Sequence, residues 1–271
     1  MQPLPEIIQR IYTATPLVGI GIAAIFYLNI LNFLLVDTLL IVLIGWEWAR
    51  LSGYERSTFR YAYLLVLLIA CWGVYHSPVE WIARLSIVMG TLVIGHVAMM
   101  LNDKKSMYYP NELLAILGVV YLPLAWYALF FLKSSTPIYL GIGLLIIVLT
   151  DTLAYVVGKR WGRHPIAPDI SPNKTWEGFL AGLCGPLCIL LIIDRISGYP
   201  FYITFKMASV VIFTTLAAIA GDLFESAVKR QIGLKDSGDG LPGHGGWLDR
   251  FDSLVCAMPV FLAGLLYLAT I

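Results

Sequence analysis

Charged residues are scarce in this sequence. Asp, Glu, Lys and Arg make up 13% of its 271 residues, about half of the ~25% that is typical of soluble domains. So few charges cannot cover the water-exposed surface of a soluble domain. Long apolar runs at 61–75, 138–150 and 209–221 therefore predict an all-α, polytopic integral membrane protein. These runs do not alternate between polar and apolar residues, which excludes a β-barrel.

Net charge and cysteine are also low. A formal net charge of +1 gives no basic surface of the kind that nucleic-acid binding requires, so no nucleic-acid partner is expected. Cys71, Cys184, Cys188 and Cys256 all lie inside apolar runs without metal-type spacing, and we interpret them as small packing residues. The first residues lack the basic, apolar and small-residue pattern of a cleaved signal, so the first apolar span is expected to be retained as an anchor.

The apolar runs predict about nine transmembrane helices in a single domain, 1–271. The segments are 16–33, 35–50, 61–76, 81–101, 112–132, 138–158, 176–194, 203–228 and 253–270. In the first two, Asn29, Asn32 and Asp37 interrupt the apolar run, which predicts a tight hairpin; one long tilted helix is the alternative.

Basic residues are concentrated in every second predicted loop. Fourteen of the 18 Lys and Arg fall in one set of segments, namely 1–12, 50–60, 101–111, 159–175 and 229–252. The positive-inside rule places this set in the cytoplasm, with the N-terminus inside and the C-terminus outside. The two longest polar loops, 159–175 and 229–252, are expected to face the cytoplasm whether the first run forms one helix or two.

A polar face interrupts the apolar predicted helix 203–228. Asp222, Glu225, Ser226 and Lys229 follow one another at i, i+3, i+4 and i+7, which places them on one side of the helix. A carboxylate inside a membrane helix costs about 2.5–3.5 kcal/mol on insertion scales, so it is rare unless it has a partner or a function. This face is therefore predicted to line a polar cavity.

Asp151 has a similar position in its own predicted helix. It lies seven residues before 158, as Asp222 lies seven residues before Lys229, and Tyr155 follows it at i+4. The matched depth of the two aspartates predicts one shared site. A structural hydrogen bond to a neighbouring helix is the alternative for either aspartate.

Lys174 lies in the loop just before a predicted helix start. Its neighbours are Ser171 and Thr175, and Glu177 follows. A lysine and hydroxyl groups at a helix N-terminus favour a phosphate site. The same residues are also typical of ordinary helix initiation.

In the stretch 229–252, 8 of 24 residues are charged, which is a third. Its glycines permit backbone N–H groups to approach an anion, and they are Gly238, Gly240, Gly243, Gly245 and Gly246. Asp249 and Asp252 are hard oxygen ligands suited to magnesium. Phosphate groups, magnesium and carboxylates together indicate phosphoryl or nucleotidyl transfer. A charged flexible loop is the alternative.

From Ser226 to Asp252 the chain closely resembles the signature of the phosphatidate cytidylyltransferases, also called CDP-diacylglycerol synthases. The matching pattern is S-x-V-K-R-x4-K-D-x-G-x2-L-P-x-H-G-G-x2-D-R-F-D. The segments GWEWARLSG (45–53), AYVVGKRWGRH and ISPNKTWEG also resemble parts of the family. The resemblance is most specific from Asp151 onward, so 1–110 are expected to be N-terminal helices and 111–271 the catalytic helices and loops.

The resemblance implies CMP transfer from CTP to phosphatidic acid, giving CDP-diacylglycerol and pyrophosphate. It also implies magnesium, a homodimer and a bacterial-type inner membrane location with the site facing the cytoplasm; whether a second cation takes part is left open. The expected metal ligands are Asp222, Asp249 and Asp252, with Asp151 as a further candidate. The expected catalytic residues are Asp222, Asp249, Lys229 and Lys174. The expected substrate-binding residues are Asp151, Tyr155, Ser171, Asn173, Arg230, Lys235, Asp236, His244, Gly245, Gly246 and Arg250.

Three other functions are considered. A related CTP-using lipid enzyme, such as a polyprenol kinase, would transfer phosphate instead of CMP. A transporter would show internal repeats and interrupted helix pairs, and the sequence shows neither. A membrane scaffold would not need the intramembrane aspartates.

Overall fold

The computed structural model describes residues 19, 21–102, 108–197, 200–241 and 245–267. Within these residues, eight helices are long and apolar enough to cross a membrane, which confirms a polytopic all-α membrane protein. They are α2 (Ile30–Leu51), α3 (Ser57–Tyr75), α4 (Val79–Asn102), α5 (Asn111–Ser135), α6 (Pro137–Trp161), α7 (Trp176–Ser197), α8 (Phe201–Gln231) and α9 (Leu248–Tyr267). The only described sheet is a short hairpin of β1 (Pro165–Ala167) and β2 (Ser171–Thr175).

The predicted break near residue 34 was wrong. Residues 21–27 are helical, the chain breaks at 28–29, and α2 is continuous from Ile30. The side chain of Asn29 accepts a hydrogen bond from the Asn32 backbone N–H at 2.8 Å, so Asn29 caps the start of α2 after this break. Asp37 is buried inside α2 and does not interrupt it. Part of the predicted first span, 16–18 and 20, lies outside the described residues.

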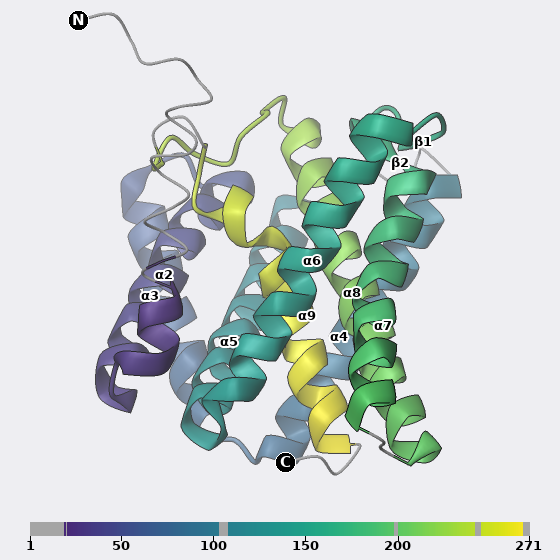
Figure 1. Ribbon diagram of the computed structural model, residues 1–271. Helices are drawn as coiled ribbons and strands as arrows, with labels where there is room; N and C mark the ends of the chain where they lie inside the picture. Colours follow the sequence, from purple (N-terminus) through teal and green to yellow (C-terminus); the bar gives the residue numbers. More distant parts are fainter. Residues whose placement is uncertain (1–18, 20, 103–107, 198–199, 242–244, 268–271) are drawn as a thin grey trace, which may run out of the picture.

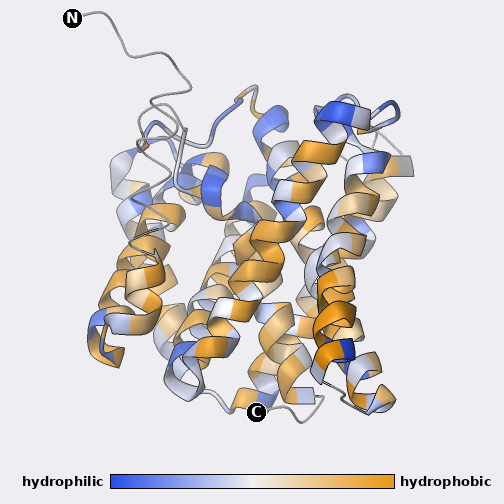
Figure 2. Ribbon diagram, in the orientation of Figure 1, coloured by the Kyte–Doolittle hydropathy of each residue, from blue (hydrophilic) through white to orange (hydrophobic). Residues whose placement is uncertain are grey.

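The helices form one bundle with a polar end and an apolar middle. Figure 1 shows β1 and β2, the end of α8 and the connection from α8 to α9 at the same end, opposite the C-terminus. Most hydrophilic residues gather at that end (Figure 2). The pairs α8–α9 and α6–α7 pack along much of their length, and α4 and α5 pack against α9. The two longest polar loops, predicted to share one side, therefore do meet at one end of the bundle in their described parts.

Helices α6 and α7 approach each other through glycine. A Cβ atom at Gly178 would lie 2.6 Å from the carbonyl oxygen of Ala154, and one at Gly182 would lie 2.9 Å from that of Thr150. Glycines four residues apart allow membrane helices to pack with their backbones close together. This contact fixes the start of α7 against the end of α6.

The hairpin between α6 and α7 carries Lys174. Its strands are antiparallel, and the first turn of α7 is tied to it: the Trp176 N–H donates to the His164 carbonyl at 2.9 Å, and the His164 side chain pairs with Glu177 at 2.7 Å. The Thr175 hydroxyl accepts from the Gly178 N–H at 3.2 Å, as in ordinary helix capping. Lys174 thus lies on a short strand one residue before the cap.

Helix α9 begins at Leu248, five residues before the predicted 253. Asp249, Arg250 and Asp252, predicted to lie in a polar loop, therefore belong to its first turns, and the connection between helices is 232–247. The helix starts early because the Glu47 carboxylate accepts hydrogen bonds from the backbone N–H groups of Trp247 and Leu248 at its start, and such groups have no partner within the helix.

Candidate active site

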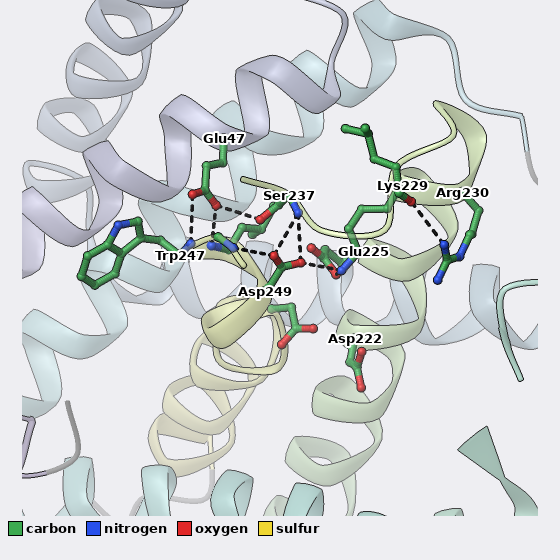
Figure 3. A network of polar contacts seen from close by, with 12 residues as sticks. Glu47, Asp222, Glu225, Lys229, Arg230, Ser237, Trp247 and Asp249 are labelled. Atoms are coloured by element: carbon green, nitrogen blue, oxygen red, sulfur yellow. Dashed lines mark hydrogen bonds and ion pairs between the residues drawn. The ribbon is translucent and has the colours of Figure 1, made fainter. Parts of the chain in front are cut away.

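Lys229 is held between two carboxylates close to the polar end of α8. Its Nζ lies 2.6 Å from Glu225 Oε2, one turn earlier, and 2.6 Å from Asp249 Oδ1 on α9. The side chains of Lys229, Glu225 and Asp249 are only 11%, 2% and 7% exposed. The predicted polar face of α8 therefore exists. Close to the polar end of the helix, this face forms a buried ion-pair triad of Glu225, Lys229 and Asp249 (Figure 3).

Asp249 also organises the connection between α8 and α9. Its carboxylate accepts the backbone N–H of Ser237 at 2.9 Å and that of Gly246 at 2.7 Å. Gly245, which precedes this contact, has φ +79°, a conformation that glycine adopts without strain. In this structure the N–H group of Gly246, which was predicted to bind a substrate anion, donates a hydrogen bond to Asp249.

A second group of charges surrounds Asp222, one turn deeper on α8. Lys174 Nζ lies 2.6 Å from Asp222 Oδ2, and Asp252 lies within interaction range of Asp222. Asp151 accepts a hydrogen bond from the Ser253 hydroxyl at 3.4 Å and lies close enough to Asp222 and Lys174 for their charges to interact. Asp151 and Asp222 therefore share one site, as their matched depth predicted.

The two groups together form what we call the acidic cluster. It consists of Asp151, Lys174, Asp222, Glu225, Lys229, Asp249 and Asp252. Five carboxyl groups share two lysine ammonium groups in it. Its members come from α6, β2, α8 and α9, so the packing of four elements is needed to assemble it.

The donor chemistry of the acidic cluster fits magnesium, which prefers carboxylate oxygen, and its surplus of acidic groups favours a cation. The geometry is different from the one predicted. Asp222 pairs with Lys174 and Asp249 with Lys229, so two of the three predicted metal ligands each have an ammonium partner. In the part of the chain described, no three Asp, Glu, His or Cys side chains are grouped to hold a metal ion. Magnesium binding by Asp222, Asp249 and Asp252 stays a prediction.

The remaining predicted residues lie around the cluster at the polar end. Arg230 donates to the Ile170 carbonyl at 3.1 Å and thereby ties α8 to the β-hairpin. Lys235, Asp236 and Arg250 are exposed, Ser171 and Asn173 lie on β2, and Tyr155 on α6 accepts from Lys159 at 3.3 Å. His244 lies outside the described residues.

Two residues of the site were not predicted. Glu225 was assigned to the polar face but to no role, although it pairs with Lys229. Glu47 on α2 accepts three hydrogen bonds from the connection between α8 and α9, and the only signal for it was its place in the segment 45–53. A carboxylate four residues before the end of an apolar helix gives no indication of a partner about 190 residues away.

Comparisons with known proteins identify the family of this chain. Residues 8–268 match the family model of the Cytidylyltransferase family. A phosphatidate cytidylyltransferase of Pseudomonas aeruginosa is 37% identical over 94% of this chain and 95% of its own length. The phosphatidate cytidylyltransferases of Staphylococcus haemolyticus and of Staphylococcus aureus strain COL are 31% and 36% identical over 68% and 64% of this chain, and over 71% and 65% of their own lengths. Because the match extends over nearly the whole sequence, the chain belongs to the cytidylyltransferase family.

Proposed function

We propose that this protein transfers CMP from CTP to phosphatidic acid, which gives CDP-diacylglycerol and pyrophosphate. The observation that carries the proposal is the similarity to the Pseudomonas aeruginosa phosphatidate cytidylyltransferase along 94% of the chain. The geometry supports it, since Lys229 and Asp249 of the signature-like stretch lie with Lys174 and Asp222 in one cluster.

The lysines of the acidic cluster are suited to hold phosphate groups. The side chains of Lys174 and Asp222 are partly exposed, at 25% and 32%, but the Lys174 Nζ atom is buried beside Asp222, so a substrate phosphate must compete with Asp222 for this ammonium group. Arg230, Lys235 and Arg250 add positive charge at the same end. When bound by Asp222, Asp249 and Asp252, magnesium would neutralise triphosphate charge and align the reacting phosphorus. The residues of the chain orient and screen the two anionic substrates.

The reaction needs no nucleophile from the protein. A phosphate oxygen of phosphatidic acid forms a bond to the α-phosphorus of CTP, the bond from that phosphorus to the bridging oxygen breaks, and pyrophosphate leaves with the electron pair. Phosphate monoesters are already anionic at neutral pH, so no strong general base is required. We assign no serine or cysteine to this step.

The shape of the molecule suits one substrate from water and one from the bilayer. The cluster lies near the polar end of eight membrane helices, where CTP arrives from solution and the phosphatidic acid headgroup lies at the same level. We propose that this end faces the cytoplasm of a bacterial-type inner membrane, following the charge bias of the loops. We also propose a homodimer, which cross-linking in native membranes and mass measurement in detergent would test.

The proposal is tested with purified protein, magnesium, phosphatidic acid and CTP labelled separately in cytosine and in the γ-phosphate. We expect the cytosine label to appear in a lipid product identified as CDP-diacylglycerol, and the γ-label to appear in pyrophosphate. Chelating magnesium should abolish the product, and adding it back should restore it. Transfer of γ-phosphate to a lipid would instead identify a kinase, and no lipid product with either label would refute the proposal.

A further inference from the structure

Glu47 of α2 is a buried carboxylate that lies outside the acidic cluster but contacts the chain that positions it. Its side chain accepts hydrogen bonds from the Trp247 N–H at 2.9 Å, the Leu248 N–H at 2.8 Å and the Ser237 hydroxyl at 2.8 Å. The residue is 6% exposed. Figure 3 shows Glu47 reaching from its helix to Ser237 and Trp247 in the connection between α8 and α9.

The three donors adjoin the groups that hold Asp249. Ser237, whose hydroxyl binds Glu47, donates its backbone N–H to Asp249 at 2.9 Å. Trp247 and Leu248 follow Gly246, the other backbone donor to Asp249. The Glu47 carboxylate therefore holds both backbone segments that donate to Asp249, one at Ser237 and one next to Gly246. It also holds the first turn of α9, the helix that carries Asp249.

Two glycines of the connection face Glu47 and not open space. A Cβ atom at Gly238 would lie 2.6 Å from Glu47 Oε1, and one at Gly246 would overlap Glu47 Oε2 and the Ser237 hydroxyl. Gly238 is not among the described glycines with positive φ, so its backbone does not require glycine. The requirement at Gly238 is space for the Glu47 side chain, and the sequence had suggested space for phosphate instead.

We infer that Glu47 is a positioning residue of the active site, which sets the place of Asp249 through the connection 232–247 and the start of α9. Position 238 is glycine because a larger residue would leave no space for the Glu47 side chain. The inference rests on the proposed function for its kinetic part only, because the contact between Glu47 and Gly238 has a test that needs no activity.

The kinetic test uses Glu47→Gln, which keeps the size of the side chain. The carboxylate receives backbone N–H groups on both oxygens, whereas an amide has one acceptor oxygen and one NH2 donor. However the amide turns, its NH2 group faces a backbone N–H. We expect kcat per folded molecule to fall by about tenfold to a hundredfold, as for other residues that orient a site, with the KM for phosphatidic acid within about twofold.

The matched control is Glu55→Gln, an exposed glutamate just after α2, which should keep the wild-type kcat. Both variants are compared after size-exclusion chromatography, so that only folded protein is assayed. If Glu47→Gln lowers the yield of folded protein but leaves kcat unchanged, the role of Glu47 is merely structural and the inference is overturned. If the wild-type protein makes no CDP-diacylglycerol, the proposed function fails first and only the next test applies.

The second test is a double-mutant cycle on thermal unfolding with Glu47→Ala and Gly238→Ala. Gly238→Ala alone should lower the unfolding midpoint, because its Cβ meets the Glu47 carboxylate. In the Glu47→Ala background the same change should lower it by less than half as much, since the obstructing side chain is gone. The control is Gly185→Ala on α7, whose Cβ would meet Leu153 of α6 and not Glu47 or Asp249, and whose cost should be the same in both backgrounds. Equal costs for Gly238→Ala in both backgrounds would overturn the assignment.

Discussion

Lys229 is the residue on which the charge balance of the buried triad depends. Glu225 and Asp249 both lie 2.6 Å from its Nζ, and neither carboxylate is more than 7% exposed. An ion pair that is buried contributes little net stability, but removing one partner leaves a buried charge without compensation. The triad is therefore more sensitive to loss of the lysine than to loss of either acid.

Lys229→Met is expected to destabilise the protein by about 3–5 kcal/mol, the usual cost of breaking a buried pair. The measurement is thermal unfolding in detergent. Adding Glu225→Gln should recover part of the lost stability, because it removes one of the two buried carboxylates that are left without an ammonium partner. A double variant as unstable as Lys229→Met alone would contradict this account.

Asp222→Asn should abolish CTP-dependent formation of CDP-diacylglycerol in membranes while the protein stays folded, because it removes a predicted metal ligand and the partner of Lys174. The control is Asp194→Asn on α7, an aspartate that accepts a hydrogen bond from Thr204 and belongs to no part of the cluster; this variant should stay active. Near-normal activity of Asp222→Asn would remove that residue from the catalytic group.

At the scale of single residues, the sequence predicted which charges lie at one site better than which charges pair with each other. Asp151, Asp222 and Lys174 could be assigned to one site because helical spacing and loop position place them at one depth. Their partners could not be predicted, since the pairing of Asp222 with Lys174 and of Asp249 with Lys229 depends on how helices pack. Glu47 was missed for the same reason.

Among the elements, the eight predicted helices from 35–50 onward are present, and their ends differ where the capping groups come from elsewhere. The start of α9 moved to Leu248 because Glu47 of α2 accepts its N–H group, and no local pattern shows a cap donated by a distant helix. The β-hairpin was not predicted, because its strands are three and five residues long and each contains a proline. Local patterns thus find apolar spans more reliably than their ends.

Gly182→Leu is expected to separate α7 from α6, because a Cβ atom there would already lie 2.9 Å from the Thr150 carbonyl oxygen. The displacement carries Lys174, just before α7, away from Asp222, so both the unfolding temperature and CDP-diacylglycerol formation should fall. Cys184→Leu, at an exposed position of the same helix, is the matched control and should change neither. An active, stable Gly182→Leu variant would show that close contact of these helices is not needed.

For the whole molecule, polar connections gather at one end and large apolar side chains face outward on several helices. Exposed apolar side chains of α3, for example, include Phe59, Leu65, Val66, Ile69 and Trp72, as expected for a surface that lipid covers. The low share of charged residues correctly predicted a membrane protein with an apolar outer surface. Which end faces the cytoplasm follows from charge bias alone and is a matter for experiment.

Single cysteines at opposite ends should report the orientation. Pro168→Cys lies in the turn of the β-hairpin and Ser77→Cys in the connection between α3 and α4. In intact bacterial spheroplasts, a membrane-impermeant maleimide should label position 77 at once and position 168 only after permeabilisation. The unmodified protein gives the background of its four cysteines. The reverse pattern would invert the proposed topology.

The contacts of Glu47 with a distant part of the chain bear on whether the protein can be expressed as two separate fragments. Residues 111–271 contain the whole signature-like stretch and every member of the acidic cluster, yet the connection they carry is fastened by a side chain of the first 110. Expressed alone, the fragment 111–271 should therefore be inactive. Co-expression with 1–110 should restore CDP-diacylglycerol formation by fragment complementation, and 1–110 carrying Glu47→Gln should restore much less. The first helices are then a part of the enzyme that can be supplied in trans but cannot be omitted.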